Sequence, residues 1–455
     1  MTLHRILATL PAAALLLAGG AASAQTAEEK LAAEVTKLRQ EVEQLKGRAD
    51  EADVRARDAV VLGDIPGSFR LPGTDLSLRL YGFVELDWVH AFRGDNSDID
   101  YSTFAPYLPI NGSPQARKTN RDYLDVRASR LGLETAYPTR FGVLQTKIEG
   151  DFNNEPRTGN AAVYGSDRNV FTQQQTNSYG FRVRHAYGAF AGLLVGQTWS
   201  TFMDVDNSPE TLDYNGPIGS TFIRQPQIRY TYGTPDYGSF TVALENSSSY
   251  ALDETGAALA SSHSRLPDLV VRWDKGFGWG SMSIRGVTQE TRVDDGASVG
   301  QARGWGAGGT VFVKTRGNQD FLSVAVTYGD GIGRYFNYVE GAAFDSAGRK
   351  VLLERALGIV AGYQYKVSPE LRFNLVYGFQ QNFDNGYTDF ARANGLDSGR
   401  FGVNRMVQQG HFGPIFTPVK GVDIGVEGIW ADRKTLAAEH GEDIRLNFMA
   451  KYYIN

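Results

Sequence analysis

The sequence predicts an all-β transmembrane barrel of 16 antiparallel strands in up-and-down order, preceded by an N-terminal α-helical coiled coil. Three observations carry this prediction. From residue 76 onward, apolar and polar residues alternate through most of the chain. The alternating segments are joined by short turns and long polar connections in turn. A heptad pattern of apolar residues precedes them, over residues 31–45.

The composition fits a large β structure and excludes several classes of function. The 455 residues include 52 Gly, 22 Tyr and 25 Phe, and the formal net charge is −5. A mildly acidic chain has no global basic field, which argues against a nucleic-acid partner. Cysteine is absent, so thiol catalysis, disulfides and cysteine-based zinc sites are excluded. Because no run of about 18 apolar residues occurs, we expect no membrane-spanning helix.

The first 24 residues have the features of a secretory signal peptide. Arg5 is followed by an apolar stretch from Ile6 to Leu17, and Ala22-Ser23-Ala24 has the small-residue pattern of a cleavage site. We therefore expect residues 1–24 to be removed, so that the mature chain begins at Gln25.

Residues 25–62 are predicted to form a coiled coil. Leu31, Val35, Leu38, Val42 and Leu45 are spaced alternately by 4 and 3 residues, with Val at the a position and Leu at d. This combination favours a dimer in isolation, although an attached domain could impose another number of strands. The alternative is a single amphipathic helix packed on a domain. Residues 63–75 contain two Pro-Gly pairs and are predicted to be a linker.

The barrel itself is predicted over residues 76–455. In its first segment, Leu78 and Leu80 flank Arg79, so one face is apolar and the other polar. The same alternation recurs in segments that begin near residues 76, 124, 141, 180, 193, 222, 238, 267, 280, 304, 320, 354, 371, 405, 421 and 443. The register stays open within 124–137, because Leu131 and Leu133 are out of step with Leu124 and Val126.

Seven short turns and eight long connections separate these segments. The long ones cover residues 90–122, 153–178, 203–221, 246–266, 290–303, 329–353, 382–404 and 432–442. A soluble β-sandwich would need neither eight long loops at one end nor a charged inner face, whereas a membrane barrel must close on itself and face apolar side chains outward. Aromatic residues at strand ends fit interfacial girdles, namely Tyr137, Trp199, Trp273, Trp279, Trp305 and Trp430.

The polar face of the predicted barrel is rich in guanidinium groups. The residues expected to line the pore and bind solute are Arg79, Lys147, Arg182, Arg184, Gln225, Gln227, Arg229, Arg272 and Arg285. Arginine presents donor forks that suit carboxylate and phosphate, so such a cluster would attract anions. The alternative is that each Arg pairs with a lumenal Glu or Asp and only stiffens the wall.

The third long connection, residues 203–221, is predicted to form a constriction loop. It carries four acidic residues, Asp204, Asp206, Glu210 and Asp213. Folded inward, this acidic loop would face the basic wall and create a transverse field. The alternative is an extracellular acidic loop.

Catalytic and metal sites have weak support. The six His residues form no metal-spaced pair. A hydrolase would need His411 near Ser283 or Ser323, but no local pattern marks a nucleophile. Asp95, Asp98 and Asp100 lack the spacing of an EF-hand, so a solvated acidic loop is preferred to a calcium site. We therefore expect no enzyme, no metal and no cofactor.

Several short motifs resemble those of DcaP-like outer-membrane porins. They are Gly67–Asp75, Ile148–Phe152, Arg184–Gly188, Leu194–Ser200, Arg224–Thr231 and Gly329–Tyr335. Together they span nearly the whole mature chain in order. One departure is the C-terminus, which ends Tyr452-Tyr453-Ile454-Asn455 rather than on the aromatic residue that usually assists barrel assembly.

The resemblance implies a homotrimeric porin of 16 strands with a periplasmic coiled coil, located in the outer membrane of a Gram-negative bacterium. It implies passive diffusion of small organic anions, typically dicarboxylic and aromatic acids. The expected partners are outer-membrane lipid, small anionic solutes, two further copies of the chain and, through the coiled coil, the cell wall. Two alternatives stay open: a porin for phosphate or other inorganic anions, and a structural tether with a plugged pore.

Overall fold

The computed structural model describes residues 21–58, 61–97, 102–153, 180–248, 250–294, 296, 299–336 and 339–454. The chain divides into two units, residues 1–61 with 71–74 and residues 62–70 with 75–455, and each is described by itself. Residues 1–20 of the predicted signal peptide lie outside the described residues, as do residues 154–178 of the second long connection. Asp98 and Asp100 also lie outside them.

The first unit contains one long helix, α1 (Ala21–Asp58). The apolar residues of the heptad, from Leu31 to Leu45, are all exposed on it. An apolar stripe on an otherwise polar helix favours association with other helices. The N-terminal helix is therefore confirmed, whereas its assembly into a coiled coil stays a prediction.

Sixteen strands form the barrel of the second unit, one of which is interrupted. Their bounds are β3 (Ser77–Arg93), β4 and β5 (Arg121–Asp125 and Arg130–Thr139), β6 (Gly142–Asp151), β7 (Arg182–Phe190), β8 (Leu193–Trp199), β9 (Arg224–Thr234), β10 (Gly238–Glu245), β12 (Asp268–Phe277), β13 (Gly280–Asp294), β14 (Val299–Thr315), β15 (Asp320–Asp330), β18 (Arg355–Lys366), β19 (Leu371–Asn382), β20 (Asn404–Val419), β21 (Val422–Thr435) and β22 (His440–Ile454).

Shorter elements lie in the connections and before the barrel. They are β1 (Val61–Leu62), β2 (Phe69–Arg70), η1 (Ala105–Tyr107), η2 (Gln115–Arg117), β11 (Ser262–His263), η3 (Gly333–Tyr335), β16 (Ala342–Asp345), β17 (Lys350–Leu353) and α5 (Gly386–Ala393).

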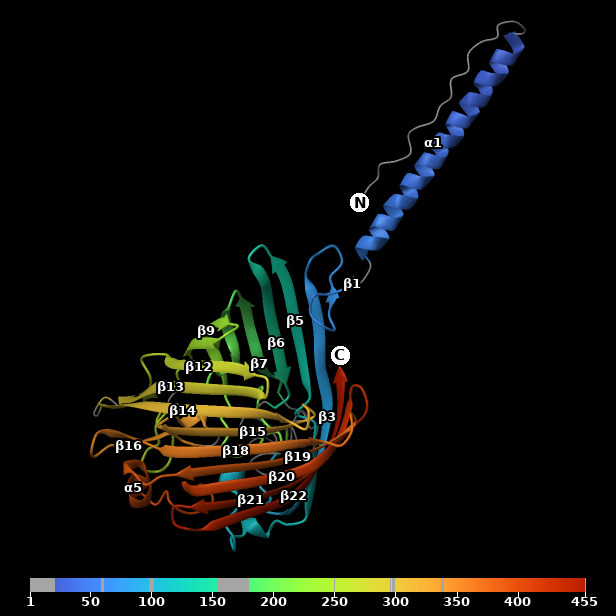
Figure 1. Cartoon of the computed structure of the whole chain (residues 1–455). Helices are drawn as coiled ribbons and strands as arrows, with labels where there is room; N and C mark the ends of the chain where they lie inside the picture. The colour runs from blue at the N-terminus through green and yellow to red at the C-terminus, as the bar shows by residue number, and fades with distance from the viewer. Residues whose placement is uncertain are drawn as a thin grey trace, which may run out of the picture. The chain divides into compact units, whose positions relative to one another are not determined.

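Each barrel strand pairs antiparallel with the next one along the chain, and β22 pairs with β3 to close the barrel. The predicted class of 16 antiparallel strands in up-and-down order is thus confirmed (Figure 1). The long connections gather at one end, near α5 and β16 in Figure 1, which is the extracellular end in barrels of this class.

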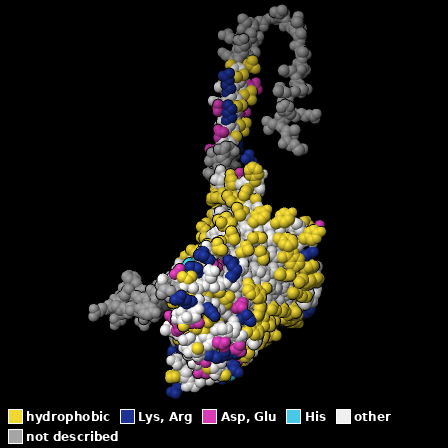
Figure 2. Space-filling view, turned by 90° about the vertical axis from the view of Figure 1, so that its left-hand side faces the viewer, with side chains coloured by type: hydrophobic (Ala, Val, Ile, Leu, Met, Phe, Trp, Pro, Cys, Tyr) yellow, Lys and Arg dark blue, Asp and Glu magenta, His cyan; other side chains and the backbone are white. Residues whose placement is uncertain are grey.

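The barrel is apolar outside and polar inside, as the alternation predicts. On β10, Val242 is 52% exposed on the outer face, whereas its neighbour Ala243 is 1% exposed. On β22, Arg445 and Asn447 are buried inside, between outward-facing apolar residues. Figure 2 shows hydrophobic side chains in a broad field over the barrel and charged side chains gathered toward one end.

The register conflict at residues 124–137 arises from a break in the strand. Asp87 of β3 pairs with Asp125, and Phe83 pairs with Arg130. Four steps along β3 therefore face five steps along its partner. The extra residue reverses the alternation, which is why Leu124 and Leu131 both face outward.

The core lies inside the barrel, where loops pack against its inner wall. Phe202 of the third loop and Tyr335 of η3 share a cluster with Val270 of β12. Leu108 of the first loop and Ile218 of the third loop share another with β20 and β21. These contacts fix the third loop within the barrel.

Candidate functional site

The third loop, here residues 200–223 between β8 and β9, follows the inner wall of the barrel. Its backbone amides at Leu212 and Asp213 donate to the Glu427 carboxylate of β21, at 3.0 and 3.2 Å. The amide of Ile218 donates to Gln409 of β20 at 3.0 Å. These hydrogen bonds, made by backbone groups that would otherwise be buried without partners, hold the loop against β20 and β21.

Three of the four acidic residues of the loop make ion pairs or hydrogen bonds with other parts of the barrel. Asp204 lies 3.3 Å from Arg272 of β12, and Glu210 lies 2.8 Å from Arg372 of β19. Asp213 is buried and accepts the amide of Thr103 from the first loop at 2.9 Å. Asp206 is exposed. Two of the four loop carboxylates are thus balanced by arginines, one from β12 and one from β19.

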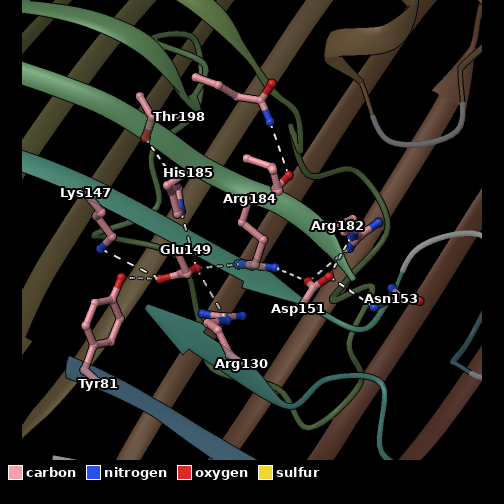
Figure 3. Close-up of polar contacts among 12 residues, drawn as sticks. Tyr81, Arg130, Lys147, Glu149, Asp151, Asn153, Arg182, Arg184, His185 and Thr198 are labelled. Carbon is pink, nitrogen blue, oxygen red and sulfur yellow. Dashed lines mark hydrogen bonds and ion pairs between the residues drawn. The ribbon is translucent and has the colours of Figure 1, made fainter. Parts of the chain in front are cut away.

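A second group of charges occupies β5, β6 and β7 (Figure 3). Arg184 donates to Glu149 at 2.7 Å and to Asp151 at 2.8 Å. Arg182 donates to Asp151 at 2.8 Å, and the Tyr214 hydroxyl of the third loop donates to the same carboxylate at 2.8 Å. The two arginines that the sequence placed on one face therefore meet at one carboxylate.

Two further arginines join this group. Arg130 of β5 lies 3.5 Å from Glu149. Arg224, the first residue of β9, stacks on Trp199, whose ring centroid is 4.3 Å from its guanidinium carbon. The guanidinium carbon of Arg184 lies 5.4 Å from the same ring. We call Arg130, Glu149, Asp151, Arg182, Arg184 and Arg224 the basic wall.

The remaining predicted cations on β3 and β6 are paired. Arg79 and Lys147 both contact Glu134 of β5, at 2.6 and 3.0 Å. They are therefore part of the charge network of the barrel wall.

The predicted residues of β9 have different surroundings. Gln225 donates to the Tyr335 hydroxyl at 2.9 Å and also to Glu245. Gln227 donates to the carbonyl oxygen of Trp199 at 2.8 Å. Within the described part of the chain, Arg229 has neither a hydrogen bond nor an ion pair.

The two arginines of the opposite wall face the third loop. Arg272 donates to Asp274 at 2.6 Å in addition to its contact with Asp204. Arg285 donates to the Thr310 hydroxyl at 2.8 Å and has no carboxylate within ion-pair distance among the described residues. Arg285 therefore adds an uncompensated charge to β13.

A cavity of about 480 Å³, the constriction cavity, lies between the third loop and the wall. Loop residues from Met203 to Phe222 line one part. The barrel strands and the break between β4 and β5 contribute Phe83, Glu85, Ala128, Arg130, Arg184, Trp199 and Lys451. Of the predicted pore-lining set, only Arg184 contacts this cavity, together with Glu210 and Asp213 of the loop. The expectation that Trp199 lies in a lipid-facing girdle is wrong, because its ring lines this inner cavity.

Sequence reasoning missed Arg130, Arg224, Tyr214 and Lys451 at this site. Arg130 directly follows the break in the second barrel strand, and the sequence pattern did not give the exact position of that break. Arg224 has the opposite parity to Gln225 and was for that reason not assigned to the lumen. Lys451 was recognisable by its alternation with Tyr452 on the last strand.

The catalytic and metal alternatives that the sequence supported only weakly gain no support from the described residues. His411 is buried with Nδ1 3.1 Å from Glu427, and the Ser323 hydroxyl donates to the carbonyl oxygen of Asn207. No group of three or more His, Asp or Glu residues that could hold a metal ion occurs in the described ranges. Of the helices in the described residues, none is both long and apolar enough to cross a bilayer.

One protein family and several solved structures of outer-membrane proteins are similar to this chain. The family model described as DcaP outer membrane protein matches residues 29–454. The structure of the outer membrane channel DcaP of Acinetobacter baumannii has a TM-score of 0.68 and 25% identity, covering 87% of this chain and 100% of that chain. No curated protein has significant sequence similarity to the chain.

Two further solved structures are similar at lower scores. OmpT of Vibrio cholerae, described in its trimer form, has a TM-score of 0.48 and 12% identity over 83% of this chain and 99% of that chain. OmpF of Salmonella typhi, in complex with daunomycin, has a TM-score of 0.49 and 11% identity over 83% of this chain and 98% of that chain. From the family match across residues 29–454, the chain belongs to the DcaP outer membrane protein family and is an outer-membrane channel of that type.

Proposed function

We propose that the channel conducts small organic anions, such as dicarboxylates, by passive diffusion past the basic wall. The observation that carries this proposal is a cluster of four guanidinium groups beside the constriction cavity. Three guanidinium groups, those of Arg130, Arg182 and Arg184, contact Glu149 or Asp151, and a fourth, that of Arg224, stacks on Trp199 beside them. Guanidinium groups present donor forks that suit carboxylates, so this cluster would attract organic anions.

Unused hydrogen-bond donors support the same conclusion. Nη1 of Arg224 and Nε of Arg130 are buried and have no hydrogen-bond partner among the described residues, although Nε of Arg130 lies 3.5 Å from Oε1 of Glu149. A buried guanidinium N–H without an acceptor costs free energy, and a solute carboxylate offers the missing acceptor. Because both donor atoms are buried, a passing anion would reach them only when the neighbouring side chains move aside.

Passage requires that the binding of each anion be weak. Arg182 and Arg184 already contact protein carboxylates, so a solute carboxylate competes with Asp151 and Glu149 instead of meeting free cations. Several such partial sites let an anion lose its water shell in steps and leave again. No covalent chemistry is involved.

We further propose that the channel assembles as a homotrimer through both the barrel and α1. The exposed apolar stripe of α1, Leu31 to Leu45, supports assembly because its burial between helices would remove apolar surface from water. In this arrangement the helices lie in the periplasm and face the cell wall.

The proposal is tested with the purified protein in a planar bilayer. Succinate added to one side should reduce the chloride current in a concentration-dependent way, and inorganic phosphate of equal charge should do so less effectively. Equal or stronger competition by phosphate would instead identify an inorganic-anion channel. Lack of competition by either anion would contradict a role of the basic wall in binding solute.

A further inference from the structure

A second cavity, of about 290 Å³, lies among the long loops at the end of the barrel that carries α5. We call it the loop-end cavity. Its polar lining consists chiefly of Tyr107, Glu340, Glu354, Gln380, Asn382 and Tyr387, and the described residues that line it include no Lys, Arg or His. We propose that this cavity binds a small organic cation with an ammonium or guanidinium group.

Two carboxylates in this cavity have no basic partner among the described residues. Glu340 accepts hydrogen bonds from the hydroxyls of Tyr107 and Tyr250, at 2.7 and 2.6 Å. Glu354, only 3% exposed, accepts from the amide of Gly341 at 2.8 Å and from Nδ2 of Asn382 at 2.5 Å. Because buried carboxylates are strongly destabilised without a counter-charge, a cation between them would be favoured.

Unsatisfied polar atoms in the same cavity indicate the chemistry of the ligand. Oε1 of Gln380, Oδ1 of Asn382 and the hydroxyl of Tyr387 are buried and have no hydrogen-bond partner among the described residues. All three residues are at most 4% exposed. The two amide oxygens can only accept, so a ligand that reaches them as it enters must donate, as an ammonium or a guanidinium does.

The remaining walls suit a short alkyl stem. Leu252, Leu396 and Val403 line the cavity, and the rings of Tyr107 and Phe401 lie 5.5 Å apart between centroids. An aromatic face attracts a cation in addition to packing on its stem. The volume, at the lower end of the range for ligand sites, fits a ligand of a few heavy atoms such as n-butylammonium.

Proton uptake at Glu354 competes with this cation. Burial raises the pKa of Glu354 to about 7, and the neighbouring Glu340 carboxylate adds to the effect. The phenols of Tyr107, Tyr250 and Tyr387 also face the two carboxylates. Arg334 contacts Asp268 at 2.6 Å in a separate ion pair, and Arg400 lies 5.7 Å from the Phe401 ring. Cation binding therefore favours the ionised carboxylate, and affinity should rise as the pH is raised through about 7.

The experiment is isothermal titration of the purified full chain in detergent with n-butylammonium chloride at pH 8. Glu340→Gln should weaken binding at least tenfold, because it removes one charge and keeps a side chain that can still pair with both phenols. Glu354→Gln should do the same and should also remove the dependence of affinity on pH. The matched control is Glu370→Gln, which makes the same charge change in the short turn before β19.

Three outcomes would overturn the proposal. The first is unchanged affinity in Glu340→Gln, which decides the question even if Glu354→Gln does not fold. The second is equal binding of sodium butyrate, which has the same stem and the opposite charge. The third is an equal loss in Glu370→Gln. Tetramethylammonium, which has no N–H, should bind more weakly than n-butylammonium. Since this assay measures binding without conduction, its result is independent of the proposed anion channel.

Discussion

Replacing Arg224 by glutamine removes one positive charge from the basic wall without leaving a carboxylate unpaired. Its guanidinium stacks on Trp199 and has no ion pair among the described residues. Arg184 is a poorer target, because its removal would leave the buried Glu149 and Asp151 short of a partner and destabilise the barrel by several kcal/mol. Arg224→Gln therefore isolates the effect of charge on selectivity.

The expected magnitude follows from Coulomb's law. A monovalent ion about 6 Å from the guanidinium gains or loses about 0.7 kcal/mol in water. Screening over a Debye length of about 10 Å at 0.1 M salt reduces this to about 0.4 kcal/mol. The anion is stabilised and the cation destabilised, so the difference is about 0.8 kcal/mol, or about fourfold in the permeability ratio. At 1 M salt the Debye length of about 3 Å leaves a factor of only about 1.4.

The assay is the reversal potential of Arg224→Gln and of the unchanged protein under a potassium chloride gradient. Arg140→Gln is the matched control, because Arg140 is exposed in the short turn between β5 and β6. We expect the ratio of chloride to potassium permeability to fall about fourfold near 0.1 M salt in Arg224→Gln only. An unchanged ratio, or an equal fall in the control, would refute the argument.

Three other predictions concern assembly and the third loop. Glu427→Gln replaces one of the two oxygens that accept from the loop amides by an NH2 group, which donates. This should weaken the attachment of the loop by about 1–3 kcal/mol and increase single-channel current noise. Unchanged noise would argue against this attachment. A Cβ at Gly413 would overlap the carbonyl oxygen of Val426, so Gly413→Ala should lower the fraction of folded barrel on a heat-modifiability gel, and a wild-type fraction would contradict the packing. Leu38→Asp places a charge in the apolar stripe of α1 and should lower the dissociation temperature of the oligomer, whereas Lys37→Asp, which lies outside the stripe, should not. Equal behaviour of the two variants would count against assembly through this stripe.

The barrel was predictable because its environment imposes a simple rule. Lipid outside and water inside require every strand to alternate, so period-two patterning, together with the short turns and long connections, located all 16 strands. The break between Asp125 and Arg130 is the exception. There the pattern showed a conflict of parity but not its cause, because an inserted residue leaves no composition signal of its own.

The candidate site was less predictable, because it depends on contacts between residues distant in sequence. Alternation placed Arg182 and Arg184 on one face, but it gave no information on their sharing Asp151. The path of the third loop depends on Glu427 and Gln409, which lie about 200 residues further along the chain. Arg224 has outward parity, and only its position at the first residue of β9, stacked on Trp199, brings it beside the wall.

The central claim, that the basic wall makes this channel select anions, is tested most directly by the reversal potential of the unchanged protein. The measurement uses a planar bilayer with a potassium chloride gradient near 0.1 M, where screening is weak. We expect stepwise conductance with a reversal potential displaced from zero toward the equilibrium potential of chloride. A reversal potential displaced toward the equilibrium potential of potassium, or no conductance at all, would contradict anion selection by the basic wall.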